Sequence, residues 1–281
     1  MVTRLESPTT DDAAFIDSLV AQNQIGVNAA YFLQIKDDWK VRVQAYIAAN
    51  GDPGLLKPWP EIAKTKKIFE SLYSSQPLVH SAQKPILDSL RTKKLQFCPA
   101  CGEDGTPNTL DHYLPKNKYP EFSVTSRNLF PMCDVCQGKK GSKTVNGADQ
   151  RLFVHPYFDD FAAFSVVRLA IGRPFESPNS FSIAPHPVLT AEQSALISRH
   201  LDELGISSRY EQFFKTEYTR LKKLVSRARA KGQDVAERIA EFHNYALDKS
   251  TNSWGAIFYQ GVLDDAELMT FLEHGPLPAY P

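Results

Sequence analysis

Apolar residues in the first third of the chain recur at the spacing of one helix face. Ile16, Leu19 and Val20 show this spacing directly after polar residues that are suited to capping a helix. The expected helices lie at 13–24, at 37–50, from Pro60 onward and near 83–94. Residues 1–95 are therefore predicted to form a helical region. The aromatic rings expected in its core are Trp39, Tyr46 and Trp59.

The last third of the chain also has a helical pattern, preceded by two short apolar segments. Thr190 followed by Gln193 is typical of a helix start, and Gly205 fits the end of that helix. Further helices are expected at 207–231, 234–247 and 264–273. Before them, FAAFSVVRLAIG and SFSIA are separated by GRPFESPN, which predicts two short strands. Residues 161–281 should therefore be a β-hairpin followed by a C-terminal helical region.

The stretch between these regions, residues 96–160, has a different pattern. Its hydrophobic runs are short, and Gly, Pro, Asn and Asp are frequent, as in a loop-rich module held by a metal. It contains every cysteine of the chain, in two C-x2-C pairs: Cys98, Cys101, Cys133 and Cys136. Four thiolates in this arrangement are suited to tetrahedral, structural Zn²⁺. The 31 residues between the pairs indicate that a further segment is inserted between the two zinc knuckles, one of which is formed by each cysteine pair.

The composition is that of a globular protein without a strong overall charge. The chain of 281 residues has 32 basic and 32 acidic side chains, so a nucleic-acid site would have to be a local patch. Basic residues are in excess at 91–151, with ten against six acidic, and at 215–231, with seven against one. No run of 18 apolar residues exists, and the first residues are polar. We therefore expect a cytoplasmic protein without a membrane partner.

Inside the cysteine frame, two short motifs add candidate chemistry. LDHYLPK contains Asp111 and His112, and RNLFPMC contains Asn128 just before the second cysteine pair. Together with both C-x2-C pairs, these motifs resemble the zinc-containing HNH endonucleases of the ββα-metal class, over roughly residues 95–145. The resemblance implies an α+β, mostly α fold. In it, a small zinc-stapled, treble-clef-like module at 96–160 is flanked by N- and C-terminal helical regions.

The resemblance also implies roles for individual residues. His112 would be the general base that activates water, Asp111 would bind a catalytic Mg²⁺ or Mn²⁺, and Asn128 would complete or orient that metal shell. A neutral imidazole suits this role because it can accept a proton near pH 7. Adjacent side chains of an ideal strand face opposite ways, so Asp111 and His112 need a bulge or a strand end to share one cleft.

The third member of the site is open on sequence grounds. Many relatives have histidine or asparagine directly after the last cysteine, whereas this chain has Gln137. His155 is the alternative candidate, although it follows the expected closing helix. Residues expected to bind nucleic-acid phosphates are Lys116, Lys118, Arg127, Lys139, Lys140, Lys222 and Lys223.

Several functions remain open at this point. The leading prediction is a metal-dependent endonuclease that hydrolyses phosphodiester bonds of DNA, and RNA is an alternative substrate. The layout, with helices on both sides of the module, is similar to nuclease subunits of Septu-type anti-phage defence systems, which implies an ATPase or sensor protein as partner. The competing interpretation is a non-catalytic, zinc-stapled module that binds nucleic acid or protein.

Overall fold

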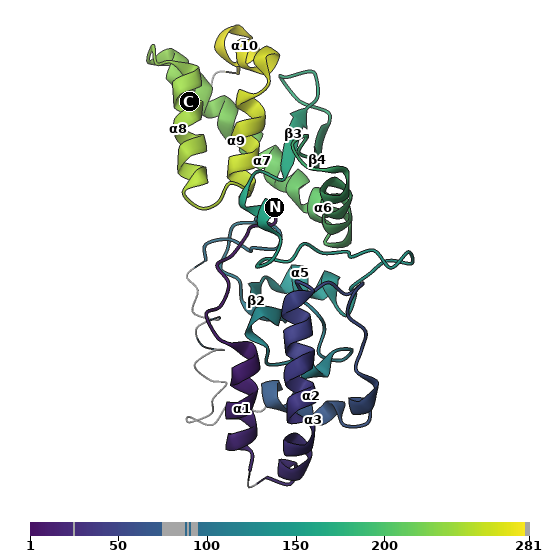
Figure 1. The fold of residues 1–281 in the computed structure, drawn as a ribbon. Coiled ribbons are helices and arrows are strands. Elements are labelled where there is room, and N and C mark those ends of the chain that lie inside the picture. The colour runs from purple at the N-terminus through teal and green to yellow at the C-terminus, as the bar shows by residue number, and fades with distance from the viewer. Residues whose placement is uncertain (25, 75–87, 89, 91–94, 279–281) are drawn as a thin grey trace. The chain divides into compact units, whose positions relative to one another are not determined.

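Two units, each built from separate stretches of the sequence, make up the fold (Figure 1). The structure, a computed structural model, describes residues 1–24, 26–74, 88, 90 and 95–278. The β1–β2 unit comprises Arg4–Leu95 and Thr106–Asp159. The β3–β4 unit comprises Met1–Thr3, Gln96–Gly105 and Asp160–Pro281. Within the described residues the secondary structure is mostly helical, with two small antiparallel sheets, so the fold class is α+β.

The N-terminal helices of the β1–β2 unit are α1 (Asp12–Gln22), α2 (Ala29–Ala48) and α3 (Lys66–Ser74), with a short 3₁₀ turn η1 (Pro60–Ile62) before α3. The helices expected in these stretches are confirmed, although α2 begins at Ala29 instead of residue 37. The expected helix near 83–94 lies outside the described residues, apart from positions 88 and 90.

Aromatic rings form the core of these helices. Trp39 and Tyr46 are fully buried, as predicted, whereas Trp59 is half-buried. The Trp39 ring stacks on Phe32 with centroids 5.9 Å apart and meets the edge of Phe69 at 5.0 Å. The Trp39 indole N–H donates to the backbone carbonyl of Glu121 at 2.8 Å. Helix α2 is therefore fastened to the segment that connects the two strands of this unit.

Strands β1 (Thr109–His112) and β2 (Leu129–Met132) pair antiparallel, with Asp111 opposite Phe130 and His112 opposite Leu129. Two 3₁₀ turns, η2 (Pro120–Phe122) and η3 (Ser126–Asn128), lie in the connection between them. Helix α5 (Asp134–Lys140) follows β2. The LDHYLPK motif therefore begins in β1, most of the RNLFPMC motif forms β2, and α5 comes directly after it.

The β3–β4 unit contains the second strand pair. A 3₁₀ turn, η4 (Asp160–Ala163), precedes strand β3 (Val167–Ile171), which pairs antiparallel with β4 (Phe181–Pro185), as expected. Helix α6 (Ala191–Glu203) starts with the predicted capping box, in which Thr190 and Gln193 exchange hydrogen bonds. The helices that follow are α7 (Ile206–Ala230), α8 (Val235–Leu247), α9 (Trp254–Leu263) and α10 (Ala266–His274).

Helix α9 was not predicted. Its sequence, WGAIFYQGVL, is almost continuously apolar, and most of its residues are buried, so no polar face marks the helical period. It packs closely on β3 because Gly261 has no side chain: a Cβ there would lie 2.8 Å from the Cβ of Leu169. None of the helices in the described ranges combines the length and the apolar character required to cross a membrane.

Candidate metal centre and acid-base site

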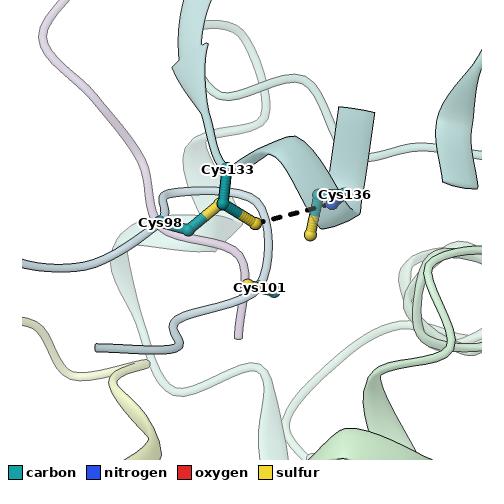
Figure 2. A group of neighbouring side chains, drawn as sticks. All are labelled: Cys98, Cys101, Cys133 and Cys136. Carbon is teal, nitrogen blue, oxygen red and sulfur yellow. Dashed lines mark hydrogen bonds between the residues drawn. The ribbon is translucent and has the colours of Figure 1, made fainter. Parts of the chain in front are cut away.

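The four cysteines form one cluster, in which all four sulfur atoms lie within 4.8 Å of one another (Figure 2). Tetrahedral zinc, with Zn–S bonds of about 2.3 Å, needs sulfur atoms roughly 3.8 Å apart, so the cluster is consistent with a structural zinc site. The second pair opens α5: Cys133 is the N-cap, and its sulfur accepts the backbone N–H of Cys136 at 3.5 Å.

The first pair sits in a tight backbone loop. The N–H of Gly102 donates to the carbonyl of Cys98 at 2.7 Å. Gly102 has a φ of 73°, and a side chain at this position would overlap the backbone of Met1 and Asn252. Glycine is therefore required here, because its missing Cβ permits both the left-handed conformation and the close approach.

Residues far away in the sequence complete the surroundings of the first pair. The Arg209 guanidinium lies 3.7 Å from the sulfur of Cys101, and the Trp254 indole N–H donates to the Cys101 carbonyl at 2.6 Å. The Nε2 of His200 donates to the carbonyl of Ala100 at 2.7 Å. A positive group close to a thiolate stabilises its charge. Sequence reasoning missed these partners because no local spacing links them to the cysteines.

His112 is the last residue of β1 and is held in one tautomer. Its Nε2 lies 2.9 Å from the carbonyl oxygen of Ser123, which can only accept a hydrogen bond. Nε2 therefore has the proton, and Nδ1 of the neutral ring has the lone pair. The ring packs edge-on against Tyr73, with centroids 4.5 Å apart. Burial lowers the pKa of His112 to about 3, so the imidazole is neutral at physiological pH.

Asp111 precedes His112 and is buried beside a lysine. Its Oδ2 faces the ammonium of Lys140 at 2.9 Å as an ion pair, but receives no well-aligned hydrogen bond. The same ammonium donates to the His112 carbonyl at 2.6 Å. Burial raises the pKa of Asp111, while Lys140 and a hydrogen bond from the Gln137 side chain favour the ionised carboxylate. The candidate third member Gln137 thus lies next to Asp111.

Asn128 is completely buried and engaged with backbone. Its Oδ1 accepts the N–H of Leu114 at 2.8 Å, and its Nδ2 donates to the carbonyls of Leu114 and Phe122, each at 3.0 Å. These contacts fix the segment just after His112 and the segment just before Ser123. Both polar atoms of the Asn128 side chain therefore have backbone partners.

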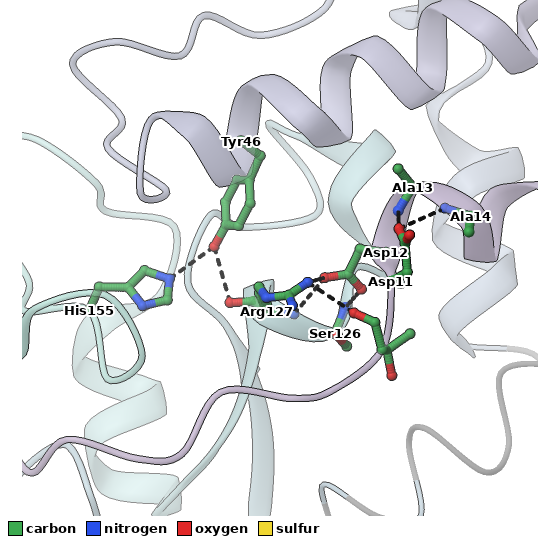
Figure 3. A network of polar contacts seen from close by, with 9 residues as sticks. Asp11, Asp12, Ala13, Ala14, Tyr46, Ser126, Arg127 and His155 are labelled. Atoms are coloured by element: carbon green, nitrogen blue, oxygen red, sulfur yellow. Dashed lines mark hydrogen bonds and ion pairs between the residues drawn. The ribbon is translucent and has the colours of Figure 1, made fainter.

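His155, the other candidate third member, lies in a different group of side chains (Figure 3). Its Nδ1 accepts the N–H of Tyr157 at 3.1 Å, so Nε2 has the proton and donates to the Tyr46 hydroxyl at 3.0 Å. Burial lowers the pKa of His155 well below 6.5. Both ring nitrogens are thus used in internal hydrogen bonds.

The residues expected to bind phosphates differ in exposure. Lys118, Lys139 and Lys223 are exposed. Arg127 forms an ion pair with Asp12 at 3.0 Å, and Lys140 is only 1 % exposed. The remaining two are half-buried and make internal contacts: Lys116 lies over the ring of Tyr73, and Lys222 donates to the carbonyl of Glu176.

Two known proteins are similar to parts of this chain. Protein ea31 of Escherichia phage lambda is 37% identical over 100 residues, which cover 34% of this chain and 32% of ea31. Septu protein PtuB of Bacillus thuringiensis is 37% identical over 54 residues, which cover 19% of this chain and 21% of PtuB. The chain thus spans a third or less of the length of these relatives. No family model matches the chain, and no solved structure gives a significant match.

Proposed function

We propose that the chain is a metal-dependent endonuclease of the HNH type, which hydrolyses phosphodiester bonds of DNA. The observation that carries the proposal is the buried, neutral His112, whose tautomer is fixed by Ser123 and whose neighbour Asp111 is a buried carboxylate. Attack on a phosphodiester needs a deprotonated water, and an imidazole held in this tautomer offers the lone pair of Nδ1 to accept that proton. Because burial lowers its pKa to about 3, His112 by itself is a weak base, and a bound divalent ion would supply the acidity of the attacking water. The proton would go to Nδ1, because Nε2 is already protonated.

The chain also offers a ligand for a divalent cation. Oδ2 of Asp111 is a buried carboxylate oxygen without a well-aligned hydrogen-bond donor, and an oxygen of this kind is a suitable ligand for Mg²⁺ or Mn²⁺. Such an ion, when bound, supplies charge neutralisation at the phosphate. Asn128 would orient the site through the backbone that it holds, and Gln137 would hold the Asp111 carboxylate. Lys140 would set the position of both catalytic residues.

Two further observations support the HNH assignment. The order of β1, β2 and α5 is the order of elements in a ββα-metal module, and the four-cysteine cluster is consistent with the structural zinc site expected of the zinc-containing members. The similarity to Septu protein PtuB supports a role in anti-phage defence. For this role we propose that the chain is an effector subunit that acts with an ATPase or sensor protein. Phosphate contacts do not distinguish DNA from RNA, so RNA is the alternative substrate.

A second candidate function is a non-catalytic module that binds nucleic acid or protein. The observation that favours it is the ion pair between Lys140 and Asp111, because an ammonium already neutralises the carboxylate that the divalent ion would use. The two functions differ in their response to added metal. A nuclease requires Mg²⁺ or Mn²⁺ for cleavage, whereas the binding module retains nucleic acid without cutting it.

The decisive experiment replaces His112 by Ala in the full chain. Cleavage of supercoiled DNA should fall by a factor of about 10² to 10⁴, the usual contribution of a general base, while zinc content stays constant. His274→Ala is the matched control, because this histidine is exposed on the last turn of α10. The assay runs with and without added Mg²⁺ or Mn²⁺, on DNA and on RNA. Equal cutting by wild type and His112→Ala would exclude the proposed role of His112.

A further inference from the structure

The two 3₁₀ turns in the β1–β2 connection are each fastened to an N-terminal helix by a buried acid–arginine pair. In η3, Arg127 pairs with Asp12 of α1 at 3.0 Å. In η2, Glu121 pairs with Arg42 of α2 at 2.6 Å. The side chains of Asp12 and Glu121 are completely buried. Burying a carboxylate is unfavourable unless it is paired and hydrogen-bonded, so both pairs specify where the turns lie.

Asp12 makes the more extensive of these contacts (Figure 3). Its Oδ1 accepts the backbone N–H of Ser126 at 2.6 Å, and its Oδ2 accepts from the side chain of Arg127 at 3.0 Å. The first-turn N–H groups of α1, those of Ala13 and Ala14, are capped instead by the adjacent Asp11. The two neighbouring acids thus have separate tasks: Asp11 caps the helix, and Asp12 reaches across to η3.

A second contact holds the same turn from the opposite side. The Tyr46 hydroxyl donates to the carbonyl of Arg127 at 3.2 Å and accepts from Nε2 of His155. The tautomer of His155 is set by the N–H of Tyr157, so the hydrogen bonds run in one direction from His155 through Tyr46 to the turn. The N–H of Ser126 and the carbonyl of Arg127, both in η3, are therefore held by buried side chains.

The turn η3 is connected to the candidate base by a short series of contacts. It ends at Asn128, whose side chain holds the carbonyl of Phe122 at 3.0 Å. The next residue, Ser123, provides the carbonyl that fixes Nε2 of His112. Asn128 also holds both backbone groups of Leu114, two residues after His112. A displacement of η3 would therefore move the backbone on both sides of the imidazole.

We infer that Asp12 is a positioning residue for His112, acting through η3 and Asn128; this inference rests on the proposed function. The carboxylate of Asp12 holds the turn η3 in place. This keeps the imidazole of His112 in the Nε2-protonated tautomer, with Nδ1 as the proton acceptor. Misplacement of a catalytic group by about 1 Å is enough to reduce a rate about 100-fold.

The test compares Asp12→Asn with Asp11→Asn in the full chain. The amide in Asp12→Asn removes the charge opposite Arg127 and places an N–H₂ group against N–H donors. We expect kcat for DNA cleavage to fall at least tenfold with KM unchanged, and the ring ¹⁵N signals of His112 to change from those of the Nε2-protonated tautomer. Asp11→Asn should leave kcat and the His112 signals unchanged.

Tyr46→Phe tests the fastening of the same turn in case Asp12→Asn does not fold, because it removes the hydroxyl that holds the carbonyl of Arg127 and accepts from His155. Its kcat should fall a few-fold, with a smaller change in the His112 signals. If Asp12→Asn folds, unchanged His112 signals and an unchanged kcat would overturn the inference. If it does not fold, the same result in Tyr46→Phe would overturn it. An equal loss of kcat in Asp11→Asn would also overturn it. If the wild type does not cut, changed His112 signals in Asp12→Asn still support the positioning role while the proposed function fails.

Discussion

The two strand pairs of this protein are similar in size and opposite in character. Strand β3 alternates buried and exposed residues, with Val167, Leu169 and Ile171 buried, as expected for a sheet with one apolar face. Strands β1 and β2 are buried almost throughout, and β1 includes the charged or polar residues Asp111 and His112 at its end. One pair thus follows the hydrophobic pattern, whereas the other departs from it.

The buried polar residues of β1 require hydrogen-bond and ion-pair partners, and these partners come from several elements. Lys140 of α5 pairs with Asp111, and Ser123 provides the acceptor for His112. For β3, by contrast, Leu169 packs closely on Gly261 of α9, which is an apolar contact. Burial of polar groups is tolerated only where each finds a partner, so the β1–β2 pair depends on the geometry of its surroundings more than on apolar area.

Loss of the zinc site should have the largest effect, and it should act mainly on the β1–β2 pair. Cys136→Ser removes a completely buried candidate ligand at the start of α5, directly after β2. Structural zinc sites contribute about 10 kcal/mol or more of binding free energy, which is coupled to folding. We expect the variant to lose its zinc, measured by elemental analysis, and the amides of β1 and β2 to exchange hydrogen faster than those of β3 and β4.

Val135→Ser is the matched control for this change. Val135 is the neighbouring residue in α5, and its side chain is exposed. The control should retain zinc and the amide protection of both strand pairs. Equal protection of β1 and β2 in Cys136→Ser and in Val135→Ser would show that the cluster does not stabilise this strand pair.

A core truncation in β3 should have the next largest effect, and it should destabilise the β3–β4 pair without changing the candidate site. Leu169→Ala leaves a cavity where the side chain packs on α9, and such a change usually costs about 2–5 kcal/mol in the free energy of unfolding. The loss is measured by urea denaturation. Because Leu169 is not part of the candidate site, the activity of the folded fraction should equal that of wild type. Reduced activity of the folded fraction would mean that the two strand pairs are coupled.

The contrast between local apolar patterns and long-range polar contacts also explains which parts of the structure could be predicted from the sequence. Helices with a polar face, such as α7, and the capping box at Thr190 have local signals in the sequence, and they were found. Helix α9 has no polar face and was missed. The cysteine cluster was predicted because the spacing within each C-x2-C pair has few alternative explanations.

The contacts of the candidate site could not be predicted in this way. The motif identified Asp111 and His112, but not Lys140 as their partner, because that ion pair depends on how α5 packs on β1. Asp12 belongs to the polar stretch that was expected only to cap a helix, and its contact with Ser126 spans more than 100 residues of sequence. Long-range polar contacts leave no periodic signal, so only the three-dimensional structure assigns partners to these buried groups.

The smallest predicted effect is a dependence of stability on pH that comes from buried imidazoles in the β1–β2 unit. Burial lowers the pKa of His112 to about 3 and that of His155 well below 6.5. Between pH 6.5 and these values the unfolded chain binds protons that the folded chain does not. The free energy of unfolding should therefore fall on acidification from pH 7, by up to about 1.4 kcal/mol per pH unit for each histidine.

His155→Gln isolates one of these contributions. Glutamine keeps an N–H donor for Tyr46 but does not titrate, so the variant should be less stable than wild type at pH 7 and lose less stability between pH 7 and pH 5.5, measured by urea denaturation. Buried carboxyl groups with a raised pKa, such as Asp111 and Asp159, act in the opposite sense in both proteins, so the difference between the two slopes reports the histidine alone. Identical slopes would mean that His155 takes up a proton in the folded state as readily as in the unfolded chain, so that burial would not lower its pKa.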